Sequence, residues 1–102
     1  MLYLCEYTWQ PHTTREQIAQ RFTQLDEQGR HHQERWRGWY QLVGGGAGFL
    51  LVESDDPRQV TEMLQPYMDL VSWDVRAIYE LTYNEMRQQM RQAATAGNGA
   101  RR

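Results

Sequence analysis

The 102-residue sequence predicts one small α+β domain, in which a four-stranded antiparallel sheet is combined with two helices. Two observations predict this class. Four segments have the alternation, or the aromatic and branched content, that is typical of strands. Two further segments begin with helix-capping residues and repeat apolar side chains at helical spacing. The order is strand, helix, strand, strand, helix, strand, which is the order of a ferredoxin-like domain.

The first strand is predicted in MLYLCEYTW, residues 1–9, which is rich in leucine and aromatic residues and ends before the turn QPHTT. A helix should follow, because Thr13 and Glu16 have the spacing of a capping box. Its buried stripe is predicted at Ile18, Ala19, Phe22 and Leu25. Gly29 is placed to end this helix in a left-handed conformation.

The second and third strands are predicted in RWRGWYQLV, residues 35–43, and AGFLLVES, residues 47–54, with three glycines between them. A phosphate-binding loop needs glycines that lead into a helix, whose first amides hold the anion. These glycines lead into a strand, no lysine follows, and Phe49 breaks the G-x-G-x-x-G spacing. We therefore expect a hairpin connection.

The second helix is predicted in SDDPRQVTEML, residues 54–64, with Pro57 at its first position and Ser54, Asp55 or Asp56 as its cap. Helix capping explains the adjacent residues Asp55 and Asp56 better than a metal site or an acid–base site does. The buried stripe of this helix is predicted at Val60, Met63 and Leu64.

The last strand is predicted in VSWDVRAIYELTY, residues 71–83, where apolar residues alternate with mostly polar ones. The domain should therefore comprise residues 1–83. Residues 84–102 predict a separate tail that is partly helical, has no obvious cap and becomes disordered at its end. We expect the domain to fold without this tail.

The composition excludes several classes of function. The net charge is −2, and all eleven basic side chains are arginines. The absence of lysine excludes Schiff-base chemistry and a Walker-type lysine, and the scattered arginines argue against nucleic acid as a partner. No apolar run is long enough to span a membrane, and the N-terminus lacks the basic start of a signal peptide. One cysteine, Cys5, fits a reducing compartment, so we expect a cytoplasmic protein in which this side chain is a small buried hydrophobe.

Apolar side chains occupy both sides of the first strand, with Tyr3, Cys5 and Tyr7 on one side and Leu2 and Leu4 on the other. Two helices can cover only one face of a sheet. The other face would expose a large apolar patch in a monomer, so the sequence predicts a homodimer in which two sheets meet, a dimeric α+β barrel. The pattern does not tell which face meets the helices. The expected contact lies at or near Trp73, Tyr79 or the row Tyr3, Cys5 and Tyr7.

Several stretches resemble a known family. They are the start MLY, the tryptophan region before the hairpin, LVESDDP and DLVSWDV, and they are similar to the proteins grouped as domain of unknown function family 3303. The resemblance covers roughly residues 1–82. It implies a ferredoxin-like fold and a dimeric α+β barrel, in agreement with the pattern of the residues. It implies no activity.

Aromatic residues are abundant for such a small domain, with four tryptophans and six tyrosines. Trp36, Trp39 and Tyr40 are candidates to line a pocket for a flat organic ligand. The competing interpretation is that they fill the core and a dimer interface, where these side chains are also favoured.

His31 and His32 are the best titratable candidates, because a histidine can exchange a proton near neutral pH. If this link is extended, adjacent side chains point to opposite sides and cannot chelate one ion. We therefore expect neither a metal nor another cofactor. Glu53 closes an apolar strand and is the carboxylate of most interest, although it can also face water or pair with Arg37 across the hairpin.

These observations favour a homodimeric binding or accessory module that engages a small hydrophobic ligand or a partner protein. The alternative is a cofactor-free monooxygenase or isomerase of the dimeric α+β barrel type. A closed cavity that contains His31, His32 or Glu53 would favour the enzyme, and a solidly packed aromatic core would favour the module.

Overall fold

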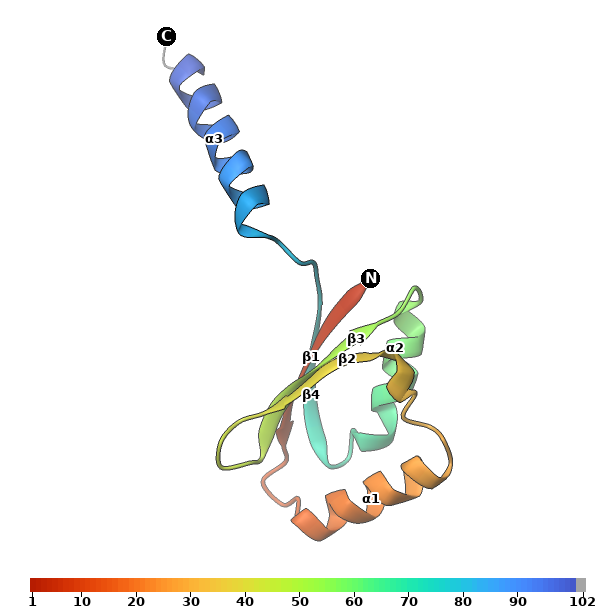
Figure 1. Ribbon diagram of the computed structural model, residues 1–102. Helices are drawn as coiled ribbons and strands as arrows, with labels where there is room; N and C mark the ends of the chain where they lie inside the picture. The colour runs from red at the N-terminus through yellow and green to blue at the C-terminus, as the bar shows by residue number, and fades with distance from the viewer. Residues whose placement is uncertain (101–102) are drawn as a thin grey trace.

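The structure, a computed structural model, describes residues 1–100 and the side chains of residues 1–96. Four strands form one sheet, and three helices accompany it (Figure 1). The elements, in chain order, are β1 (Leu2–Trp9), α1 (Arg15–Glu27), β2 (Trp36–Gln41), β3 (Ala47–Glu53), α2 (Pro57–Leu64), β4 (Val71–Ile78) and α3 (Tyr83–Ala100). Short 3-10 turns precede β2 and follow α2, at Gln33–Arg35 and Gln65–Tyr67.

The strands lie in the order β2-β3-β1-β4, and every neighbouring pair is antiparallel. The predicted α+β class and the ferredoxin-like order are therefore confirmed. The first and last strands of the chain form a neighbouring pair, and β2 is held at the edge by the hairpin to β3. This hairpin contains Gly44, Gly45 and Gly46, all with φ between 81° and 100°, as the hairpin prediction required.

The register separates two faces of the sheet. Cys5 stands opposite Leu50 and Val75, and these three residues belong to the face that α1 and α2 cover (Figure 1). Leu4 stands opposite Leu51 and Arg76 on the other face, which we call the open face.

One prediction about these faces is wrong. Tyr3, Cys5 and Tyr7 are buried under the helices, and Trp73 packs beside them, so these residues are not on the sheet face that is free to meet another sheet. On β1, the row Tyr3, Cys5 and Tyr7 is more aromatic than the row Leu2 and Leu4. Its larger side chains fill the core beneath the helices. Tyr79, which follows β4, is 82% exposed.

The core lies between the sheet and α2. The helix contributes Val60, Met63 and Leu64, as predicted, and they pack against Tyr3, Cys5, Leu50 and Val52. A smaller cluster of buried side chains lies near the end of β1 and the start of β4, at Tyr7, Leu70 and Val71. Cys5 is fully buried, and burial raises the pKa of its thiol to about 11, so it is the small hydrophobe that was expected.

The start of α1 is one residue later than the capping box predicted. Thr14 and Gln17 form the box, and the hydroxyl of Thr13 instead donates to the carbonyl oxygen of Leu70 at 2.6 Å. That tertiary bond removes Thr13 from the capping position. Gly29 ends the helix with φ 66°, as predicted.

The chain after β4 also differs from the prediction. The strand ends at Ile78 rather than near Tyr83, and the hydroxyl of Thr82 accepts a hydrogen bond from the amide of Glu85 and caps α3. The helix extends to Ala100 and leads away from the sheet and from the other helices (Figure 1). Disorder is predicted for the end of the tail, where the sequence turns into alanine, glycine, asparagine and arginine; residues 101 and 102 of this stretch lie outside the described residues. None of the described helices combines the length and the hydropathy that a bilayer crossing requires.

Candidate functional site

A cavity of about 820 Å³ lies between the covered face of the sheet and α1. Its wall is largely aromatic, and it also includes the glycines of the β2–β3 hairpin. The tryptophan, tyrosine and phenylalanine side chains that line it come from the sheet, from α1 and from the 3-10 turn after α2: Tyr7, Trp9, Phe22, Trp36, Trp39, Tyr67 and Trp73. An apolar cavity of this size and lining is typical of a small-molecule site.

The cavity exists because α1 is held by polar contacts at its start and at its middle, and few of its side chains pack against the sheet. Leu25 is its one buried residue, and Ile18 and Phe22 remain half-buried. Thr13 anchors the start of the helix to Leu70. The guanidinium of Arg21 donates to both carboxylate oxygens of Asp69, at 2.7 and 2.9 Å, and to the carbonyl of Pro66.

His31 and Tyr67 form the polar pair of the cavity wall. Nε2 of His31 lies 2.7 Å from the hydroxyl of Tyr67, and the two rings are nearly parallel. His31 is only 8% exposed. Burial lowers its pKa, against the opposing charge of Asp26, and burial also raises the pKa of Tyr67 to about 12. Both groups are therefore uncharged near neutral pH, and the hydrogen bond between them fixes the orientation of the His31 ring.

The aromatic wall is a connected set of rings. Phe22 lies 4.5 Å from the His31 ring and 6.0 Å from the Trp39 ring, measured between centroids. Nε1 of Trp39 donates to the hydroxyl of Tyr7 at 3.1 Å, and the Tyr7 ring meets Trp73 edge-on at 5.7 Å. These contacts fix the orientations of the rings that face the cavity.

Trp73 contributes a donor that has no acceptor. Its Nε1 is buried, and no described residue accepts a hydrogen bond from it. An unpaired buried donor costs about 1–3 kcal/mol, and native structures contain few of them. The ring of Trp73 is part of the cavity wall, but this atom is enclosed by the protein and has almost no surface that a ligand could reach.

Three of the six predicted ligand residues line this cavity: His31, Trp36 and Trp39. The two tryptophans share a face although they are three positions apart, because the register shifts between Trp36 and Gly38 and the bulge absorbs one residue. Their rings meet edge-on at 5.5 Å. Nε1 of Trp36 also donates to the carbonyl of His31, so the bulge and the histidine are held together.

The other three predicted residues lie elsewhere. His32 has a left-handed backbone with φ 52°, is exposed and lies 3.7 Å from the carboxylate of Glu34. Tyr40 is 54% exposed on the open face, where it stacks on Phe49 with centroids 5.0 Å apart. Neither side chain lines the cavity.

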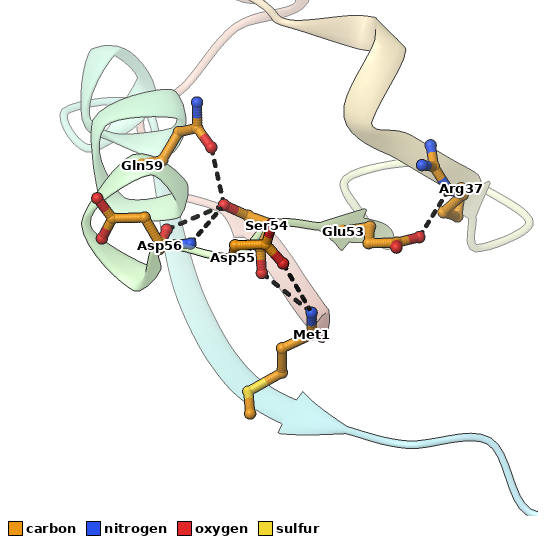
Figure 2. A network of polar contacts seen from close by, with 7 residues as sticks. All are labelled: Met1, Arg37, Glu53, Ser54, Asp55, Asp56 and Gln59. Atoms are coloured by element: carbon orange, nitrogen blue, oxygen red, sulfur yellow. Dashed lines mark hydrogen bonds and ion pairs between the residues drawn. The ribbon is translucent and has the colours of Figure 1, made fainter.

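Glu53 pairs with Arg37 at 2.9 Å on the open face, at the end of β3 (Figure 2). Beside this pair, the hydroxyl of Ser54 donates to Gln59, and the carboxylate of Asp56 accepts from the amide of Arg58 at 3.0 Å. Asp56, one of the three residues predicted as the cap, therefore caps α2. Within residues 1–100, no three side chains of the metal-binding types gather into one group.

Several residues of the site were not singled out as ligand residues by the sequence, and Tyr67 and Arg15 are the two polar ones that matter most for its chemistry. Tyr67 stands in the connection QPYMDL, where an aromatic residue after a proline is the only signal. Arg15 is the first residue of α1 and lines the cavity, yet its charge suggests an ordinary solvated position. The places of Tyr67 and Arg15 in the cavity wall depend on how α1 and the connection after α2 pack in the folded chain.

The fold and the cavity together define a small ferredoxin-like protein with an aromatic site under its first helix. Residues 1–94 match the family described as domain of unknown function DUF3303, and the chain belongs to this family. The match extends beyond the expected limit near residue 82 and includes α3 as far as Ala94, so most of the tail is part of the family's domain. Among curated proteins, none matches this chain significantly.

Proposed function

We propose that this protein binds a small, flat and largely apolar molecule in the cavity between the sheet and α1. The observation that carries the proposal is the aromatic cavity itself, with a volume of about 820 Å³. Ligand pockets have volumes of about 300–1,000 Å³ and combine apolar walls with a few polar groups. Here the polar groups include the hydrogen-bonded pair of His31 and Tyr67.

We also propose that the binding unit is a homodimer in which the open faces of two sheets meet. The open face carries half-buried apolar side chains on its central strands, at Leu2, Leu4, Phe49 and Leu51. No helix covers these side chains (Figure 1). A second copy would bury them, and a cytoplasmic location agrees with the single, fully buried cysteine. Light scattering at micromolar concentration should give twice the 12.2 kDa chain mass, and a Leu4→Glu substitution should lower it.

The binding proposal is tested with 2-naphthamide, a flat and uncharged probe, by the quenching of tryptophan fluorescence. We expect saturable binding to the wild-type protein. Ala19→Phe places a ring inside the cavity and should weaken binding at least tenfold. Ala93→Phe, the same substitution on exposed α3, should leave it unchanged. Absence of saturable binding, or equal binding to both variants, would overturn the proposal.

The His31–Tyr67 pair favours a second candidate function, that of a cofactor-free isomerase or monooxygenase. A neutral histidine inside a cavity can accept a proton from an acidic C–H group of a ligand. The test is hydrogen–deuterium exchange of 2-tetralone, a flat ketone with acidic C–H groups, followed by NMR in D₂O. If the protein accelerates exchange and His31→Gln removes the acceleration, the site handles protons. If the exchange rate equals the rate in buffer without protein, the site binds its ligand without abstracting a proton.

A further inference from the structure

We propose that the ligand of this cavity is an aromatic carboxylic acid, bound as a monoanion whose carboxylate pairs with Arg15. The inference rests on the proposed binding function and specifies the chemistry of the ligand. The first observation is the charge of the wall. Among the described residues that line the cavity, Arg15 is the one formally charged side chain, and no carboxylate is present. His31, the other basic group, is kept neutral by its burial.

The second observation is that Arg15 has no partner within the described part of the chain. Four of the nine described arginines pair with carboxylates: Arg21 with Asp69, Arg37 with Glu53, Arg58 with Asp56 and Arg76 with Asp74. Of the five described arginines that do not, Arg15 is the one that lines the cavity. The side chain of Arg15 forms neither an ion pair nor a hydrogen bond with any described residue. A planar carboxylate matches the guanidinium with two parallel hydrogen bonds, and a single cation fits a monoanion better than a dianionic phosphate.

The third observation is the position of Arg15 along the cavity. The register places Trp9 opposite Val71 and Tyr7 opposite Trp73, and the turn after Trp9 leads directly to α1. Trp73 is therefore only two residues along the sheet from the end at which Arg15 enters the wall. The wall at this end therefore combines the guanidinium of Arg15 with aromatic rings.

The opposite end of the cavity has a different character. His31 follows the C-terminal end of α1, whose 13 residues span about 20 Å at 1.5 Å per residue. The cavity therefore has an anion-binding end near Arg15 and a neutral hydrogen-bonding end at His31 and Tyr67, with aromatic walls between them. A flat aromatic acid, with a hydroxyl or carbonyl group far from its carboxylate, matches both ends.

The experiment compares 2-naphthoate with 2-naphthamide, which have nearly the same shape and differ in charge. We expect naphthoate to bind the wild-type protein about tenfold more tightly at low ionic strength, with a smaller preference in high salt. Arg15→Gln should abolish this preference and leave naphthamide binding unchanged. Arg91→Gln removes another exposed helical arginine, on α3 away from the cavity, and should keep the preference.

The outcomes separate this inference from the function on which it rests. Equal affinities for the two probes in the wild-type protein would overturn the carboxylate assignment and leave the binding function in place. A preference that survives in Arg15→Gln would overturn the role of Arg15. If neither probe binds, the binding function fails, and the inference fails with it.

Discussion

The two helices on the covered face differ in how they meet the sheet. The shorter helix, α2, has eight residues and buries three of them, whereas α1 has thirteen residues and buries only Leu25. The buried apolar residues of α2 lie within its last five positions, at Val60, Met63 and Leu64. Side chains so close together on one side of the helix can all pack into the core. Those of α1 are spread along its length, and the helix is fixed by polar anchors instead. Length therefore does not decide which helix builds the core, and the loosely packed helix creates the site.

The two helices on this face also have different roles. The cluster around α2 is buried, and its members Leu50, Met63 and Leu64 also form part of the cavity wall, whereas the anchored α1 leaves space above aromatic rings. Close packing gives stability, and the space gives a place for a ligand. Three experiments test this difference, and they follow in order of expected effect.

The largest effect should come from shortening one apolar side chain in each helix. Leu64→Ala should lower the free energy of unfolding by about 2–5 kcal/mol, because Leu64 is buried in the core. Ile18→Ala should cost about 1 kcal/mol or less, because Ile18 is half-buried and borders the cavity. Urea denaturation measures both values. Equal losses would show that α1 belongs to the core as much as α2 does.

A smaller effect should come from the protonation of His31. Its pKa is lowered in the folded state, so the unfolded chain binds the proton more readily below the ordinary value of about 6.5. Stability should therefore fall as the pH drops from 7 through this value toward the folded pKa. His31→Gln should flatten this slope, whereas His12→Gln, at an exposed histidine, should keep it. Denaturation curves from pH 7.5 to 5 measure the slopes, and equal slopes in the two variants would contradict the prediction.

The smallest effect should come from the anchor between Arg21 and Asp69. Asp69→Asn should cost about 1 kcal/mol or less at pH 7, because the pair is largely solvated. The hydrogen bond from Arg21 lowers the pKa of Asp69, so its stabilisation is present above about pH 4 and is lost as the pH falls through the folded pKa.

Thermal melts at pH 7 and pH 2.5 check the anchor. The wild-type protein and the Asp69→Asn variant should differ at the first pH and converge at the second. Asp55→Asn is the matched control, since Asp55 is exposed and lies 4.0 Å from the terminal amino group. A difference that persists at pH 2.5 would assign the effect to a change other than the ion pair.

Much of the fold could be predicted because its signals are local. Gly29 and the three hairpin glycines mark positions with positive φ, and Pro57 with Asp56 marks the start of α2. Where a local signal competes with a tertiary contact, the prediction fails. Thr13 is a good capping residue, but its hydroxyl donates to Leu70, which is 57 residues away in the chain.

The candidate site is less predictable, because its members meet only in the folded chain. Trp36 and Trp39 were good candidates by residue type, but in a regular strand they would point to opposite faces. The bulge at Arg37 places both in the cavity and leaves Tyr40 on the open face. His31 and His32 look alike in sequence, and only the hydrogen bond to Tyr67 distinguishes the buried ring from the exposed one.

The sequence by itself determined the elements, their order and the stripe that α2 buries, because capping, turns and periodicity act over a few residues. The tertiary structure decided which face of the sheet the helices cover, how far α1 stands from it and which rings line the space between them. These properties depend on contacts between residues that are distant in the chain, such as Arg21 with Asp69 and His31 with Tyr67. No local pattern encodes such contacts, because their free energy arises only when the sheet has brought both partners together.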